Sequence, residues 1–137
     1  MSRIIKTDSA GKDRARLTKG IVLAVRELAL QTGPGPRSRD LAAFIALSLE
    51  ATADTIESSV AAWEKRGYWV KADRFRMDWA WAGQLAAKMT QALQADDWGA
   101  VAQVAAQAGQ RLGKLTVPAG HRLGEPWVGA WEEFGRR

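Results

Sequence analysis

The feature of this sequence that most constrains its fold is a stripe of apolar residues between positions 71 and 94. Apolar side chains recur there at alternating intervals of four and three residues, which places them along one face of an α-helix. The stripe consists of Phe75, Trp79, Ala82, Ala86, Met89 and Leu93. The sequence therefore predicts an amphipathic helix over about 71–94, and this helix must bury its apolar face against other elements.

The same periodicity recurs in three other segments and predicts helices over about 13–31, 38–66 and 97–112. A Gly33-Pro34-Gly35-Pro36 run separates the first two of these helices, because proline lacks the amide hydrogen and clashes with the preceding helical turn. No segment alternates apolar and polar residues as a half-buried strand does. The pattern predicts an all-α fold in which residues 1–113 form an antiparallel four-helix bundle.

The residues that flank these helices match the preferences of helix caps. Ser38 is the candidate N-cap of the second helix, and the Asp96-Asp97 pair supplies a cap for the fourth. Gly67 and Gly113 follow the second and fourth helices, where glycine is favoured because it has no Cβ. The second helix also carries small polar side chains near its apolar face, and these let other helices approach closely: Ser48, Thr52, Thr55 and Ser59.

Residues 114–137 form a tail of different character, because glycine and proline interrupt it repeatedly. The tail predicts one last short helix, in which Trp127, Trp131 and Phe134 share one side. A helix of about ten residues is marginal alone in water, so it must bury these rings on another surface. We expect the tail to pack on the chain's own helices near Trp81, and docking on a neighbouring copy is the alternative.

The composition excludes several classes of site. The chain has no cysteine and a single histidine, His121, which excludes disulfides, zinc–thiolate sites, iron–sulfur clusters and multi-histidine metal centres. A di-metal carboxylate bundle needs Glu-x-x-His pairs on two helices, and the sequence has none. We therefore expect a protein without catalytic residues, metal or cofactor, and not an enzyme.

The hydropathy of the chain indicates a location away from membranes. No apolar run approaches the roughly 18–20 residues that a membrane span requires. Residues 1–6 lack the apolar core of a signal peptide. We expect no membrane partner and a cytoplasmic location.

Charge is distributed unevenly along the chain, whose formal net charge is +5. Residues 1–39 carry a net charge of +6, residues 40–64 carry −5 without a single base, residues 65–76 carry +4, and residues 77–137 are neutral. This segregation predicts one positive and one negative face. A positive face attracts polyanions such as nucleic acids, although a charged face that only confers solubility gives the same pattern.

The segment from Trp63 to Trp81 combines both ingredients of a nucleic-acid surface, because five bases alternate with six aromatic residues. Cations neutralise phosphates, and flat rings stack on unpaired bases. Trp63, Phe75 and Trp79 lie on predicted apolar stripes, however, so these three rings are expected in the core. The candidate nucleic-acid-binding residues from this segment and the first helix are Arg14, Arg16, Lys19, Lys65, Arg66, Trp69, Lys71, Arg74 and Arg76.

These observations predict a basic helical protein that binds the backbone of DNA or RNA with little sequence preference, as a subunit of a larger assembly. The alternative is a scaffold subunit whose charged faces mediate self-association or docking to an acidic protein partner. The sequence does not distinguish DNA from RNA, or single from double strands.

Overall fold

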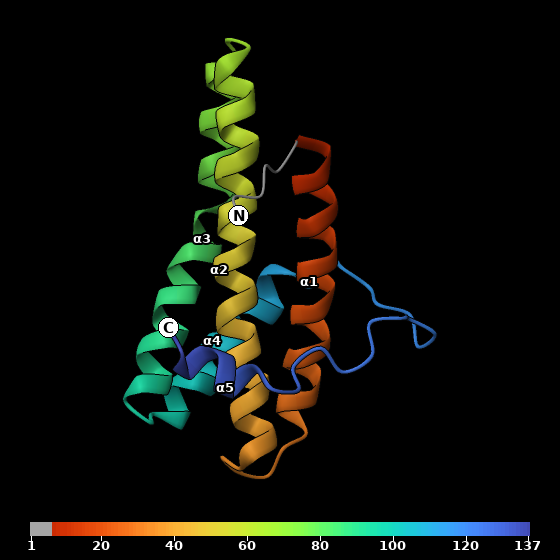
Figure 1. Ribbon diagram of the computed structural model, residues 1–137, viewed down its shortest axis with the longest axis vertical. Coiled ribbons are helices and arrows are strands. Elements are labelled where there is room, and N and C mark those ends of the chain that lie inside the picture. Colours follow the sequence, from red (N-terminus) through yellow and green to blue (C-terminus); the bar gives the residue numbers. More distant parts are fainter. Residues whose placement is uncertain (1–6) are drawn as a thin grey trace.

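Five helices build the computed structural model, which describes residues 7–137 (Figure 1). The prediction of an all-helical chain is confirmed, since the described residues contain no strand. The helix boundaries agree with the predicted ones within two residues, with two exceptions. Helix α1 includes residues from Thr7, and α5 begins at Ala130, so Trp127 lies before it and not in the same helix as Trp131 and Phe134. The helices are α1 (Thr7–Ala29), α2 (Pro36–Lys65), α3 (Trp69–Gln94), α4 (Trp98–Arg111) and α5 (Ala130–Gly135).

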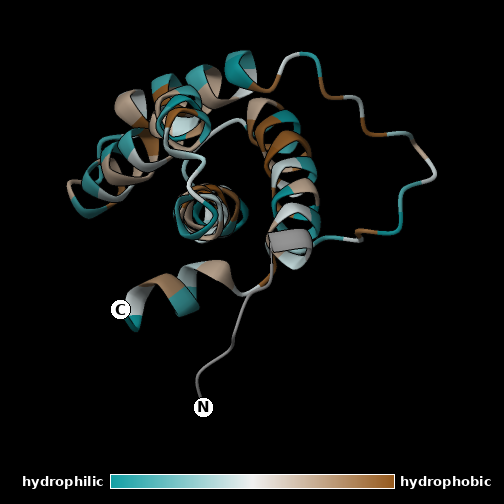
Figure 2. Cartoon of the chain, turned by 90° about the horizontal axis from the view of Figure 1, so that it is seen from above, coloured by the Kyte–Doolittle hydropathy of each residue, from teal (hydrophilic) through white to brown (hydrophobic). Residues whose placement is uncertain are grey.

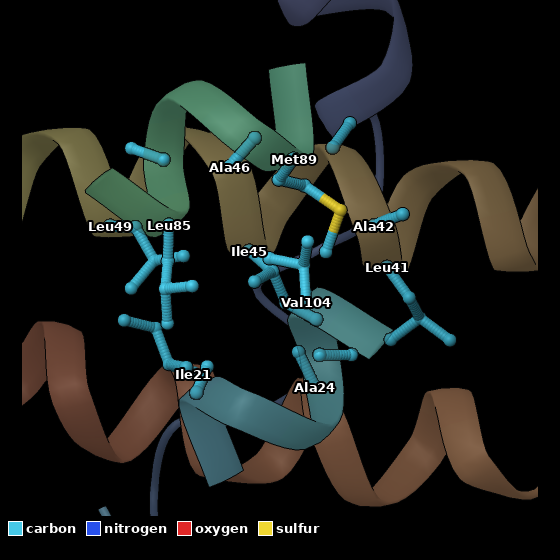
Figure 3. Packing of buried hydrophobic residues seen from close by; sticks show 14 of the residues in the cluster. Ile21, Ala24, Leu41, Ala42, Ile45, Ala46, Leu49, Leu85, Met89 and Val104 are labelled. Carbon is cyan, nitrogen blue, oxygen red and sulfur yellow. The ribbon is translucent and has the colours of Figure 1, made fainter. Parts of the chain in front are cut away.

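Helix α2 lies at the centre of the fold and contacts each of the other four helices. Seen from above in Figure 2, α1, α3 and α5 surround α2. Helix α4 contacts both α1 and α3 and lies on the far side from α5. The main core forms where these helices meet, and Figure 3 shows the side chains that fill it. Its largest fully buried members include Ile21, Leu41, Ile45, Leu49 and Met89.

Small residues allow the other helices to pack closely against α2. Ser48, Thr52, Thr55 and Ser59 are all buried, as expected for positions near the apolar face. The Thr52 hydroxyl donates to the Ser48 carbonyl oxygen at 2.7 Å, and the Thr55 hydroxyl donates to the Thr52 carbonyl oxygen at 2.6 Å. These hydroxyls therefore satisfy their own hydrogen bonds within α2 and add little bulk to its surface.

The ends of the helices follow the predicted chemistry with one correction. Ser38 is not the N-cap of α2, because Gly35 occupies that position and Pro36 begins the helix; the Ser38 hydroxyl instead donates to the Gly33 carbonyl oxygen at 2.6 Å. Proline is favoured in the first helical turn, since its missing N–H would have no helical partner there. The other three predictions hold: Gly67 follows α2 with a φ of +81°, an Asp97 carboxylate oxygen accepts from the Ala100 amide at 3.1 Å, and Gly113 directly follows Leu112, the C-cap of α4.

The end of the α2–α3 hairpin projects beyond the rest of the fold, as Figure 1 shows. It has its own hydrophobic cluster, in which Ile56, Val60 and Ala72 are buried. Half-buried aromatic rings from both helices surround this cluster: Trp63, Phe75 and Trp79. These three rings therefore lie on apolar surface as predicted: Trp63 and Phe75 pack against the hairpin cluster, and Trp79 packs against both this cluster and the main core.

The tail packs on the chain's own helices, although not near Trp81 as predicted. Helix α5 lies on α2, where the Asp40 carboxylate accepts from the Gly129 and Trp131 amides at 3.3 and 2.9 Å. Phe134 is buried, and its ring stacks on that of Trp131 with centroids 5.8 Å apart. Trp81 is buried too, but it lines a hollow with residues of α4, and α5 has no contact with α4.

Two leucines provide a matched test of where the core lies. Leu41 is fully buried, whereas Leu30 is 72% exposed at the end of α1. We expect Leu41→Ala to lower the free energy of unfolding by about 2–5 kcal/mol, and Leu30→Ala to change it by less than about 0.5 kcal/mol. Chemical denaturation followed by circular dichroism measures both values. Equal effects of the two substitutions would show that α2 is not the centre of the core.

Candidate nucleic-acid interface

The projecting end of the hairpin exposes large side chains that most folds bury. Tyr68 is 55% exposed and Trp69 is 60% exposed, because the turn between α2 and α3 extends past every other helix. Val70, the next residue, is exposed as well, and so is Met77 about two turns further along α3. No other described helix covers these side chains, since α2 ends and α3 begins at this turn.

A groove of about 650 Å³ opens at this end of the hairpin. Aromatic rings form much of its wall, and two cations and one carboxylate lie among them. We call it the tip groove, and its lining residues are Trp63, Gly67, Tyr68, Trp69, Val70, Lys71, Arg74, Phe75 and Asp78. Ligand sites are typically hollows of this size with mostly apolar walls and a few polar groups.

Four of the predicted phosphate ligands gather at the tip groove. Lys71 and Arg74 line it, and Lys65 and Arg66 flank the turn at its end. None of the four forms an ion pair with a carboxylate among the described residues, and all are exposed. The Lys71 ammonium lies 4.6 Å from the Trp63 ring centroid, a cation–π contact that leaves its charge uncompensated.

Arg76 differs from these four because carboxylates surround its guanidinium. It bonds Glu57 at 3.3 Å and lies 3.8 Å from Glu64 and 3.6 Å from Asp73. The hydrogen bonds that Arg76 donates to the Glu57 carboxylate are the main reason that the pKa of Arg76 is raised above its ordinary value. The charge of Arg76 is thus balanced within the hairpin, and a phosphate would have to compete with three carboxylates.

Arg14 joins α1 to the hairpin rather than facing solvent. Its guanidinium donates to the hydroxyls of Thr55 and Ser59 at 3.3 and 3.4 Å, and to the Thr55 carbonyl oxygen at 3.4 Å. It also lies 4.9 Å from the ring centroid of Phe75 and 5.8 Å from that of Trp79. Burial lowers the pKa of Arg14. The sequence gave no sign of this role, because the partners are 41 to 45 positions away.

The two remaining predicted cations lie on α1, outside the tip groove. Arg16 is exposed and approaches only Asp13, at 3.7 Å along its own helix. Lys19 is exposed as well. Of the nine predicted site residues, the structure therefore gathers Trp69 and four cations at one end of the hairpin, and it places Arg14, Arg16, Lys19 and Arg76 elsewhere.

The acidic block of α2 does not form the free negative face that the charge segregation predicts. Its carboxylates are engaged by other parts of the chain: Asp40 accepts from the backbone of α5, Glu50 pairs with Arg137, and Glu57 and Glu64 pair with Arg76. The exception is Asp54, whose pKa is raised by burial and by the nearby Glu50 charge. Opposite charges distant in sequence thus neutralise one another across helix contacts.

Five side chains that line the tip groove were not among the predicted site residues: Trp63, Tyr68, Val70, Phe75 and Asp78. Tyr68 follows Gly67 directly and is not part of a predicted apolar stripe, and a ring at such a turn is a signal of exposure that could have identified it. Asp78 gave no such signal. It reaches the groove because α3 places it one turn after Arg74.

Other classes of site find little support in the described residues. No group of three or more metal-ligating side chains comes together within residues 9–137. His121 lies in the loop before α5, where its Nδ1 accepts from the Leu123 amide at 3.2 Å. In the part of the chain that the structure describes, no helix is both long and apolar enough to cross a membrane. Comparison of the chain with family models, curated proteins and solved structures finds no match.

The contacts of Arg14 lead to a stability prediction with a matched control. Arg14→Ala removes the hydrogen bonds and ring contacts that join α1 to the hairpin, and we expect it to lower the free energy of unfolding by about 1–2 kcal/mol. Arg16→Ala removes an equal charge from the exposed face of the same helix and should cost less than about 0.5 kcal/mol. Urea denaturation measures both. A loss for Arg16→Ala as large as that for Arg14→Ala would contradict the role of Arg14.

Proposed function

We propose that this protein binds the sugar–phosphate backbone of nucleic acids, without strong sequence preference and without catalysis. The observation that carries the proposal is the cluster of four unpaired cations at the tip groove: Lys65, Arg66, Lys71 and Arg74. Three carboxylates of the hairpin, those of Glu57, Glu64 and Asp73, pair with Arg76 and not with these four cations. Phosphate neutralisation by such cations releases counterions, which drives binding of this kind.

The position of the cluster suits a long, charged ligand. The hairpin projects from the body of the protein, so an extended polyanion can pass across its end without meeting other helices. Cations on the outer end of a projecting element also concentrate the electrostatic potential there and speed encounter with a polyanion. Sequence preference is not expected, since contacts to phosphates carry no direct sequence information.

Further parts of the prediction remain proposals. We propose that α1 to α4 form an antiparallel four-helix bundle and that the protein is located in the cytoplasm. We also propose that the protein works as a subunit of a larger assembly. A scaffold that docks to an acidic protein through its charged faces is the alternative function. The α2 carboxylates pair with cations of the same chain, which counts against self-association of copies through opposite charges, because such self-association needs a free negative face.

Two arginines on α3 test the proposal as a matched pair. Arg74 lines the tip groove without a carboxylate partner, whereas Arg76, two positions on, is held by Glu57. We expect Arg74→Ala to weaken binding to a mixed-sequence oligonucleotide, because one phosphate contact is lost. Arg76→Ala should leave the affinity within about twofold. Fluorescence anisotropy with labelled DNA and RNA measures both.

The salt dependence provides the control. If all four cations contact phosphates, the affinity of the unmodified protein should fall about 50- to 150-fold between 50 and 200 mM salt. Arg74→Ala should reduce the slope of log affinity against log salt concentration by about one, because one fewer phosphate is neutralised. Absence of binding to any nucleic acid at low salt would refute the proposed function. Binding that Arg76→Ala weakens as much as Arg74→Ala would place the interface elsewhere.

A further inference from the structure

We propose that the tip groove selects single-stranded over double-stranded nucleic acid, because it provides a stacking surface for an unpaired base. This inference rests on the proposed function and adds the class of ligand. Two different kinds of group meet in the groove: exposed aromatic rings, Tyr68 and Trp69, and the unpaired cations Lys71 and Arg74. A backbone-only site would need the cations alone.

Some aromatic rings of the groove already contact other side chains, and the remaining rings are available for stacking. Of the four aromatic residues that line the groove, Trp63 has its ring under the Lys71 ammonium at 4.6 Å. Phe75 packs edge-on against Trp63, with ring centroids 4.8 Å apart, and meets the Arg14 guanidinium at 4.9 Å. Tyr68 and Trp69 make no ring contact with a described residue. These two rings are the free platform.

The charges around the groove orient the ligand. Lys71 and Arg74 attract the phosphates, while Asp78 lines the same groove and repels them. The backbone of the ligand is therefore expected on the side of the two cations, with its bases turned toward Tyr68 and Trp69. Stacking of this kind tolerates every base, because each base has a flat π face. It fits the lack of sequence preference in the proposed function.

A duplex cannot use the platform. Its base faces are hidden in the stack, and it presents only phosphates and groove edges to a protein. The exposed rings of Tyr68 and Trp69 would therefore add nothing to the affinity for a double-stranded ligand. A single strand satisfies both parts of the site, since its phosphates meet the cations while an exposed base covers a ring. Charge complementarity thus favours a single strand over a purely apolar partner.

The test compares equilibrium binding of the full chain to three labelled ligands of about 15 nucleotides: oligo(dT), oligo(rU) and a mixed-sequence duplex. The variants are Trp69→Ala, the conservative Trp69→Phe, and Met77→Ala as a control at an exposed apolar residue of α3 that does not line the groove. We expect the unmodified protein to bind at least one single strand about fivefold or more tightly than the duplex. Trp69→Ala should lose about 5- to 150-fold in single-strand affinity, with duplex affinity unchanged.

Two controls belong to the same prediction. Trp69→Phe should retain most of the preference because it keeps a flat ring, and Met77→Ala should retain all of it. Quenching of tryptophan fluorescence by oligo(dT), reduced in Trp69→Ala, would support stacking directly.

The outcomes separate this inference from the proposed function. Equal affinity for single strands and duplex, or a Trp69→Ala variant that binds single strands normally, overturns the stacking inference and leaves backbone binding intact. Absence of binding to all three ligands overturns both, and would favour the reading of the tip groove as a protein-docking surface.

Discussion

The fold depends on close packing around one long central helix. Every other helix contacts α2, and this is feasible only because α2 presents alanine, serine and threonine where its neighbours approach. The hydroxyls of Thr52 and Thr55 bond to their own helix, so burying them leaves no polar group unsatisfied. Larger side chains at these positions would push α1 and α3 outward and open the core that Figure 3 shows.

Because the helices differ in length, the end of the α2–α3 hairpin projects from the packed body of the fold. Helix α2 has 30 residues and α3 has 26, whereas α4 has 14; at about 1.5 Å per residue, α4 covers less than half the length of α2. Beyond α4 and α5 the hairpin depends on its own aromatic cluster and on Arg14 from α1. The same uncovered end carries exposed rings and unpaired cations, so the shape of the fold and the candidate interface have one cause.

Much of the fold could be predicted from the sequence, because periodicity and helix breakers are local signals. The four long helices, the Gly67 turn and the Asp97 cap all follow from neighbouring residues. Contacts between distant segments could not be predicted in the same way. The residues around Arg14 in the sequence do not indicate its contacts with Thr55 and Phe75, and those around Arg76 do not indicate its ion pair with Glu57. For the site, the sequence identified a basic aromatic segment, but only the structure divides its cations into paired and unpaired ones.

The central claim is that nucleic acid binds at the end of the α2–α3 hairpin. The most direct measurement is the map of backbone amide chemical-shift changes in the ¹⁵N-labelled protein as an oligonucleotide is added. We expect the largest changes within residues 63–78, with little change in α4 and α5. Changes centred on α5 or on the outer face of α1, with residues 63–78 unaffected, would contradict it.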